Sequence, residues 1–462
     1  MFRTVRSFII PAPLRLCASL LCPALAVALA AGCATTQPKA GATAGVAESA
    51  ITVAELAAVF EPAAETGAAE PAESAAGTLT PGAALRLAAE KNPGFAEYAA
   101  VREAALAEVM AASAWKNPSL EAGAGRGKTR GDPSTSGFEY SLGLIQPVES
   151  PAKRGIRKEA AAAGVKVAEL DGALFRSTLR ADVLRAYWTA VGCEEEETQG
   201  KLLKEFADAS VRLAEAQVAA GELKETALPP LKIEALKAEQ EWMAAGMRGK
   251  LAENLLRRLC GGTLPEGGWG RWRAPSFAPA SLGAARELAL KKHPAILKLE
   301  AEARRCELLV KQAESAKKPD LTPGLEVSRG VDVLSWSARL GMELPFWNRN
   351  KAGIAAAKAE LHRVEARLAS ARQDVASGVA SAVLEHANAI SCMKGAFKAV
   401  GAAIKTSQAV RSMMAAGEID QSAHIAAMRE NELLDREAYR ATTTAVLARI
   451  QLEQAIGYGE LQ

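Results

Sequence analysis

The chain has 462 residues, of which 24% are charged and 5% aromatic, with a formal net charge of +3. The scarcity of large rings argues against a compact enzyme core and favours helices that pack through small residues. Three of the 56 basic residues lie in the first 32 positions, so the remaining basic residues balance the 53 acidic ones. A chain without excess positive charge is not expected to bind nucleic acid.

Residues 1–32 are predicted to be an export signal, because a basic region without acids precedes the apolar stretch LCPALAVALAAGC. Cys33 follows Leu-Ala-Ala-Gly and resembles the acylated cysteine of bacterial lipoproteins, which predicts a lipid anchor. Ordinary signal-peptidase cleavage after Ala30 is the alternative. Ala34 replaces the Asp that would indicate retention in the inner membrane, so the outer membrane is the expected location.

Residues 33–77 are rich in Ala, Gly, Pro, Glu and Thr and are expected to form a low-complexity tether, since they carry few large apolar side chains. The cysteines beyond the tether show no CxxC spacing. We expect them to be small buried helix residues rather than disulfide or zinc ligands: Cys193, Cys260, Cys306 and Cys392.

From residue 78 onward the sequence follows one plan twice. LGLIQPVESPAKRGI (142–156) is matched 198 residues later by LGMELPFWNRNKAGI (340–354), which pairs Pro147 with Pro345 and Gly155 with Gly353. We therefore expect repeat 1 at 78–262, a linker at 263–280, repeat 2 at 281–457 and a tail at 458–462.

Each repeat is predicted to open with two short helices, because Pro93 and Pro294 disfavour helix at the residue before them. Thr80 and Ser281 are the expected N-caps. Two extended runs with Gly-rich turns follow and predict a β-hairpin in each repeat: 119–127 with 138–147, and 321–330 with 331–345.

A very long helix comes next in each repeat, since residues 156–220 contain no Pro. Apolar and small residues step by three and four, which predicts a coiled-coil seam in each long helix. The first seam runs through Val167, Leu170, Leu174, Ser177, Ala181, Leu184, Trp188 and Val191, and the second through Leu361, Val364, Leu368, Ala371, Val375, Gly378 and Ala382. Gly221 and Gly417 are expected to cap these helices before a second long helix returns.

Enzyme motifs are weak. GAGRGKT (123–129) has the wrong glycine spacing for a phosphate-binding loop and is expected to be a surface loop. The acidic run 194–197 is expected to be a solvated helix face. Thioether and imidazole groups that would suit Cu(I) cluster near the second helix turn: Met413, Met414, His424 and Met428. We favour the interpretation that these methionines fill contacts between helices.

The ALRLAAEKNP opening, the LPFWNRNKAGIAAAKAEL junction and the AAGEI turn, in this order and duplicated, resemble the TolC-type outer-membrane efflux factors across residues 80–457. The resemblance implies a mostly α-helical homotrimer, in which each protomer gives four strands to a twelve-stranded outer-membrane β-barrel and long coiled-coil helices to a periplasmic tunnel. Pro147 and Pro345 would mark the change from strand to helix. The closed, adaptor-contacting tip would lie at Gly221, Glu222, Gly417, Glu418 and Asp420. The family often carries an Asp six residues past the turn Gly, where this chain has Ala423.

The resemblance further implies a passive exit duct for heavy metals or drugs, joined through a periplasmic adaptor to an inner-membrane pump of the RND type. It implies neither catalysis nor a cofactor nor a resident metal. Two alternatives stay open: a type I protein-secretion channel, and a coiled-coil lipoprotein with a purely structural role.

Overall fold

The computed structural model describes residues 78–130, 133–265, 267–270, 281–419 and 421–457, with the side chain of residue 421 excepted. All of them belong to one compact unit, residues 59–462. The expected export signal, Cys33, the tether, the C-terminal tail and Asp420 lie outside the described residues.

Repeat 1 contains the elements expected from its sequence. Two short helices lead to a hairpin, a 69-residue helix and a return helix: α3 (Pro81–Lys91), α4 (Gly94–Ser113), β1 (Ser119–Lys128), β2 (Ser136–Ile145), α5 (Pro151–Ala219), the short 3-10 helix η2 (Glu225–Ala227) and α6 (Leu228–Leu259). At helical rise, α5 extends over roughly 100 Å.

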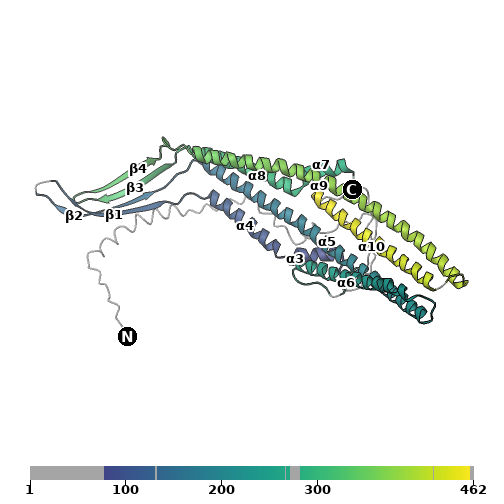
Figure 1. Ribbon diagram of the computed structural model, residues 1–462. Coiled ribbons are helices and arrows are strands. Elements are labelled where there is room, and N and C mark those ends of the chain that lie inside the picture. Colours follow the sequence, from purple (N-terminus) through teal and green to yellow (C-terminus); the bar gives the residue numbers. More distant parts are fainter. Residues whose placement is uncertain (1–77, 131–132, 266, 271–280, 420, 458–462) are drawn as a thin grey trace, which may run out of the picture. The chain divides into compact units, whose positions relative to one another are not determined.

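Repeat 2 has the same order of elements: α7 (Leu282–Lys292), α8 (Pro294–Ser315), β3 (Leu321–Arg329), β4 (Leu334–Met342), α9 (Lys351–Ala415) and α10 (Gln421–Ile456). The two hairpins join through an antiparallel β2–β3 pairing into one four-stranded sheet of order β1-β2-β3-β4 (Figure 1). The prediction of a mostly helical protein with four strands is confirmed. Among the described residues, no helix is both long enough and apolar enough to cross a membrane.

Local sequence explains the breaks between elements. Thr80 Oγ1 accepts a hydrogen bond from Ala83 N at 3.2 Å, and Pro81 occupies the first helical position of α3. Asn92 turns the chain into α4: its Oδ1 accepts from Gly94 N, and its Nδ2 donates to Leu259 O at the end of α6.

The described part of the expected linker is attached to repeat 1. Leu79 and Trp269 form a parallel bridge, with Leu79 N donating to Gly268 O and Gly270 N donating to Leu79 O, both at 2.9 Å. The buried Tyr187 of α5 donates its hydroxyl to the same Leu79 carbonyl at 3.0 Å. Burial raises the pKa of Tyr187 to about 12.

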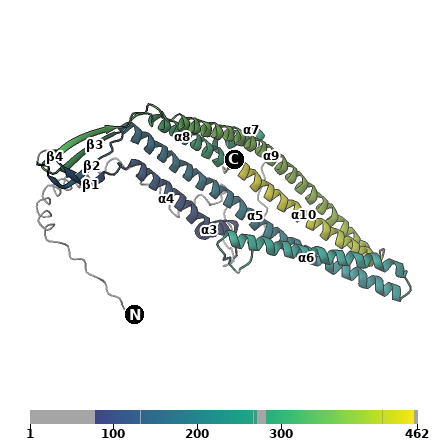
Figure 2. The same ribbon diagram turned by 60° about the vertical axis from the view of Figure 1, so that its left-hand side comes forward.

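α5 is the central helix of the described unit. It packs against α4, α6, α8 and α10, whereas α9 packs against α7, α8 and α10 (Figures 1 and 2). The main core surrounds α5 and includes Leu85, Val183, Leu256 and Ile450. A smaller cluster around Val379 and Leu452 joins α9, α10 and α7.

Three expectations about packing are wrong. In the first part of α5, the small residues Gly164, Ala168 and Gly172 are buried, while Val167, Leu170 and Leu174 are only partly buried, because small side chains let the neighbouring helices approach. Cys392 is exposed, unlike the other three cysteines of the described part.

The third correction concerns GAGRGKT, for which the predicted loop overlapped the predicted extended run 119–127. Residues 123–128 belong to β1, so the strand prediction is confirmed there and the loop prediction is wrong. Gly125 and Gly127 pair in register with Glu139 and Gly137 of β2.

Candidate conduit site

The four-stranded sheet separates apolar from polar residues between its two faces. Strand register places Leu142 opposite Ala122 on one side and opposite Val327 on the other, and Val327 opposite Trp336. The same alternation defines an apolar face, which carries three basic residues, Arg126, Lys128 and Arg329, at the loop end of the strands. Its apolar members are Leu120, Ala122, Ala124, Phe138, Tyr140, Leu142, Leu144, Leu325, Val327, Leu334, Trp336, Ala338, Leu340 and Met342.

The apolar face is exposed within the single chain. Trp336 is 83% exposed, Leu340 73% and Phe138 63%. In β2 the apolar positions are exposed, while Glu139 and Ser141 between them are partly buried. This is the reverse of a water-soluble sheet, which covers its apolar face, and exposed apolar patches mark membrane or protein contacts.

The opposite, polar face is made of glycine, serine, threonine and a few charged residues. It includes Glu121, Glu139, Ser141, Gly143, Glu326, Ser328, Ser335, Ser337, Arg339 and Gly341. Arg339 pairs with Glu326, so Glu121 and Glu139 leave this face with excess negative charge. An aqueous environment suits such a surface.

Both edges of the sheet are unpaired in the described chain. β1 pairs only with β2, and β4 only with β3. Each edge therefore offers a row of backbone donors and acceptors along about nine or ten residues, which a further strand can pair with.

Of the predicted junction residues, Pro147 and Pro345 lie between the strands and the long helices, whereas Gly155 and Gly353 lie inside those helices. Pro147 follows β2, and Pro345 follows β4. Neither starts a helix: α5 begins at Pro151, and α9 begins at Lys351 after Asn350 in the left-handed conformation. Gly155 is the fifth residue of α5, and a Cβ there would meet nothing within 4 Å. Gly353 is the third residue of α9, and a Cβ there would clash with the side-chain amide of Asn350.

Asp320 links the junctions of both repeats and was not identified from the sequence. Its carboxylate accepts from Lys153 Nζ at 2.6 Å and from Lys116 Nζ at 2.9 Å. Partial burial alone would raise the pKa of Asp320, but the hydrogen bonds and charges of the two lysines hold it below its usual value. Ion-pair partners brought together from distant segments leave no local sequence signal.

The two helix turns share the same pair of capping hydrogen bonds. Gly221 and Gly417 both have a φ of 75°. Gly221 N donates to Val218 O and Glu222 N to Gln217 O; Gly417 N donates to Met414 O and Glu418 N to Met413 O. These are Schellman caps, in which glycine takes the left-handed position.

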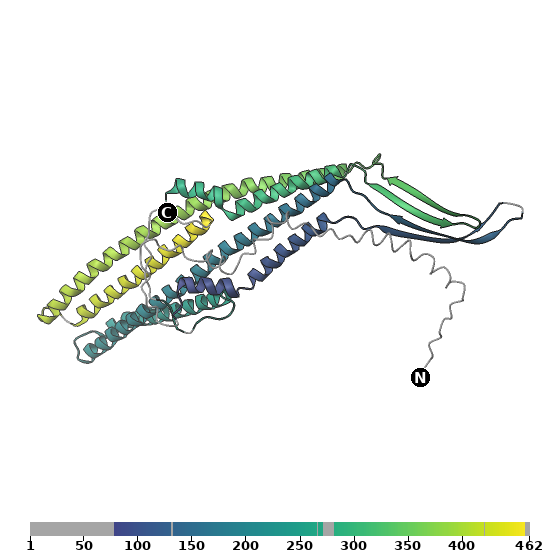
Figure 3. The same ribbon diagram turned by 180° about the vertical axis from the view of Figure 1, so that it is seen from behind.

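The expected tip residues Glu222 and Glu418 directly follow these glycines and are exposed. The two turns lie at the same end of the helical hairpins, opposite the sheet (Figures 1 and 3). The helix turns therefore bring Glu222 and Glu418 to one end of the described unit.

Ion pairs connect the two helical hairpins toward this end. Arg429 and Arg436 of α10 pair with Glu234 and Glu241 of α6. Glu196 of α5 accepts from Arg248 of α6 at 2.7 Å and from Arg440 of α10 at 3.1 Å. The expectation of a solvated helix face at 194–197 holds at the exposed Glu194 but is wrong at Glu196, whose side chain is only 14% exposed.

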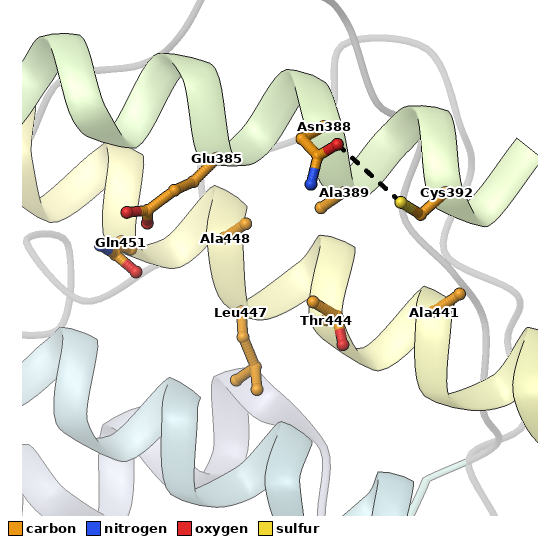
Figure 4. A pocket seen from close by; sticks show the side chains of 9 residues that line it. All are labelled: Glu385, Asn388, Ala389, Cys392, Ala441, Thr444, Leu447, Ala448 and Gln451. Atoms are coloured by element: carbon orange, nitrogen blue, oxygen red, sulfur yellow. Dashed lines mark hydrogen bonds between the residues drawn. The ribbon is translucent and has the colours of Figure 1, made fainter.

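A groove of about 350 Å³ lies between α9 and α10 (Figure 4). Small residues such as Ala389 and Ala448 form part of its wall, and Glu385 and Cys392 lie at its rim. Cys392 Sγ lies 4.0 Å from Asn388 Oδ1.

Among the described residues, no group of three His, Cys, Asp or Glu side chains is arranged to hold a metal ion. Met428 near the second turn contacts Arg411 through its sulfur at 3.8 Å.

A family model described as outer membrane efflux protein matches residues 84–262 and 285–458. The chain belongs to this family. The resemblance found in the sequence is thereby confirmed.

The chain is also similar to individual proteins in sequence or in fold. The cobalt-zinc-cadmium resistance protein CzcC of Cupriavidus metallidurans is 27% identical over 285 residues, which is 61% of this chain and 66% of the relative, just under two thirds of its length. The solved structure of CusC superposes with a TM-score of 0.66 at 17% identity, covering 81% of this chain and 91% of CusC. The CmeC outer membrane channel of Campylobacter jejuni gives a TM-score of 0.66 at 16% identity, with 80% and 84% covered. These structures share the fold.

Proposed function

We propose that this protein is the outer-membrane exit duct of a tripartite efflux system for metal cations. Three copies join their sheets into a twelve-stranded barrel, with the apolar face toward lipid and the polar face toward water. The observation that carries the proposal is the reversed sheet: exposed leucines and aromatic rings on one face, glycine, serine and glutamate on the other, and two open edges. Closure removes those edges.

The helices supply the periplasmic part of the duct. The hairpins α5–α6 and α9–α10 carry the turns at Gly221 and Gly417 away from the sheet, where a periplasmic adaptor and an inner-membrane pump of the RND type would meet them. Transport through the duct is passive, and the pump supplies the energy. Cys33, if acylated, adds a lipid anchor before the tether.

Metal cations are favoured as the substrate class by two observations. CzcC is named as a cobalt-zinc-cadmium resistance protein. In addition, the polar face carries three acidic residues, Glu121, Glu139 and Glu326, and one basic residue, Arg339. Rings of carboxylates in a pore attract cations. Glu418 and Asp420 at the second turn would add acidic groups at the tip.

Planar-bilayer recording of the purified protein tests the duct. We expect ion-conducting channels that prefer cations, with a preference that weakens in Glu139→Gln; Ser141→Gln on the same face is the matched control. A protein that never conducts, under conditions where it is folded and trimeric, would contradict the duct. Unchanged selectivity in Glu139→Gln would contradict the role of the acidic face.

Growth of a deletion strain on cobalt, zinc and cadmium tests the substrate. We expect lost metal resistance that the wild-type gene restores. Restored resistance to organic drugs alone would assign a different substrate class to the same duct. A fatty-acid analogue that labels wild type but not Cys33→Ser tests the anchor.

A further inference from the structure

The four connections between strands and helices lie together and carry exposed rings and positive charge. Lys116 Nζ pairs with Asp320 at 2.9 Å, and Gln146 Nε2 donates to Lys116 O at 2.8 Å, so three of the connections are joined. Asn350 joins the fourth, because its Nδ2 donates to Ala313 O in the last turn of α8 at 2.9 Å. The connections thus form one level of the molecule, between the sheet and the helices.

This level is basic although the mature chain is balanced. Eleven basic and five acidic residues lie in the four connections and in the nearest eight residues of each adjoining helix, α4, α5, α8 and α9. The connections are residues 114–118, 146–150, 316–320 and 343–350. Lys317, Lys318 and Arg349 are exposed, and no acidic side chain of the described chain pairs with them. Arg154 stacks over the Trp115 ring at 4.2 Å.

Two neighbouring rings in the connection after β4 are exposed. Trp347 is 96% exposed and Phe346 65%, and their centroids lie 6.2 Å apart in an edge-to-face arrangement. Leu344, Met342 and Leu340 continue from them into the apolar face. Large rings held in water beside an apolar sheet are expected at a membrane–water interface, where amphipathic rings concentrate.

We propose that these residues form a junction belt, defined as Arg154, Lys317, Lys318, Phe346, Trp347 and Arg349, that binds the phosphate headgroups of anionic phospholipid. The rings enter the headgroup layer, and the four cations contact lipid phosphates. The belt rests on the proposed insertion of the sheet into the outer membrane and adds a lipid preference to it. Charge complementarity and continuity with the apolar face select phospholipid as the occupant.

Binding of spin-labelled phosphatidylglycerol and phosphatidylcholine to the full-length protein in mixed micelles tests the belt. Tryptophan quenching reports binding, and the difference between wild type and Trp347→Phe isolates the signal of that ring. We expect phosphatidylglycerol to bind more tightly. Basic residues are attracted to an anionic lipid surface, so the triple variant Lys317→Gln, Lys318→Gln, Arg349→Gln should weaken this binding by at least roughly tenfold.

A matched triple variant on α9 removes the same charge away from the sheet: Lys394→Gln, Lys398→Gln and Lys405→Gln, all exposed. It should leave phosphatidylglycerol binding unchanged. Equal binding of the two lipids to wild type, or equal loss in both triple variants, would overturn the belt. Competition by millimolar inorganic phosphate would also overturn it, because a free phosphate site would then explain the binding.

Channel recordings on the same preparations, in neutral lipid, separate this proposal from the proposed function. Conducting channels without a phosphatidylglycerol preference would refute the belt alone. Absence of conductance in the folded protein would refute the duct, whatever the lipid binding.

Discussion

The long helices α5 and α9 occupy equivalent places in the two repeats but have different surroundings. α5 is enclosed by helices on several sides and buries Val183, Tyr187 and Val191, whereas α9 leaves Leu384 and Phe397 exposed at 69% and 53%. The backbone plan is common to both repeats, and the side chains decide which copy becomes the centre. The exposed face of α9 is the surface that a neighbouring copy would cover in the proposed trimer.

The largest expected difference in stability between the repeats is for alanine substitution at Tyr187 and at its equivalent 198 residues later, Glu385. Tyr187 is 2% exposed, contacts the Trp188 and Trp269 rings and donates to Leu79 O, while Glu385 is exposed. Tyr187→Ala should cost about 3–5 kcal/mol because it leaves a cavity, and Glu385→Ala should change stability by less than about 0.5 kcal/mol. Denaturant unfolding in detergent, followed by circular dichroism, measures both. Similar losses would show that the two helices are equally central.

In the strands, equivalent substitutions in the two repeats should have equal effects on stability, because both hairpins place apolar residues on one face and polar residues on the other. Leu142→Arg and its equivalent Leu340→Arg place a charge on the apolar face, and each should cost about 2–4 kcal/mol if that face meets lipid. Ser141→Arg should be tolerated, since repeat 2 already carries Arg339 at the equivalent position. Urea titration of folding into lipid vesicles measures the difference. Equal tolerance of Leu142→Arg and Ser141→Arg would exclude a membrane barrel.

Asp320 distinguishes the repeats at the junction, because only repeat 2 supplies this acid and both of its lysine partners come from repeat 1. Asp320→Asn should destabilise the protein by about 1.5–3 kcal/mol, the range for hydrogen bonds to charged groups. The folded-state pKa of Asp320 is lowered, so this difference is fully present above the usual carboxyl pKa and disappears as the pH falls through the folded-state value. Unfolding of both proteins between pH 7 and pH 2 measures it; a constant difference would assign the effect to packing.

Sequence patterns predicted the features that depend on local chemistry. Pro93 and Pro294 end the first helices, Gly221 and Gly417 end the long ones, and the hairpins follow from alternating residues and Gly-rich turns. Whether a residue is buried depends on elements far away in the chain, so periodicity misplaced the seam in the first part of α5.

Contacts between repeats were equally hidden in the sequence. The exposure of Cys392 and the bridge from Glu196 to Arg440 depend on where α10 lies, which no local pattern specifies. The candidate site was found in part: the junction and tip residues were expected, whereas Asp320 and the exposed Trp347 were not identified.

The smallest expected difference is between alanine substitutions at two helix glycines, Gly192 and Gly378. One substitution should destabilise the protein and the other should stabilise it. A Cβ on Gly192 of α5 would lie 2.6 Å from Thr443 Oγ1 and 2.8 Å from its Cγ2, while a Cβ on Gly378 of α9 would meet nothing within 4 Å. Thr443 is β-branched and its hydroxyl donates to Tyr439 O, so it has little freedom to move away.

Alanine is favoured over glycine inside a helix by about 1 kcal/mol. Gly378→Ala should therefore stabilise the protein by up to about 1 kcal/mol, whereas overpacking in Gly192→Ala should reverse that gain and destabilise it by about 1 kcal/mol. The double variant Gly192→Ala, Thr443→Ser removes the Cγ2 methyl group, lets the serine hydroxyl rotate, and should recover part of the loss. If both single variants stabilise the protein equally, α5 and α10 are not in the close contact that makes α5 the central helix.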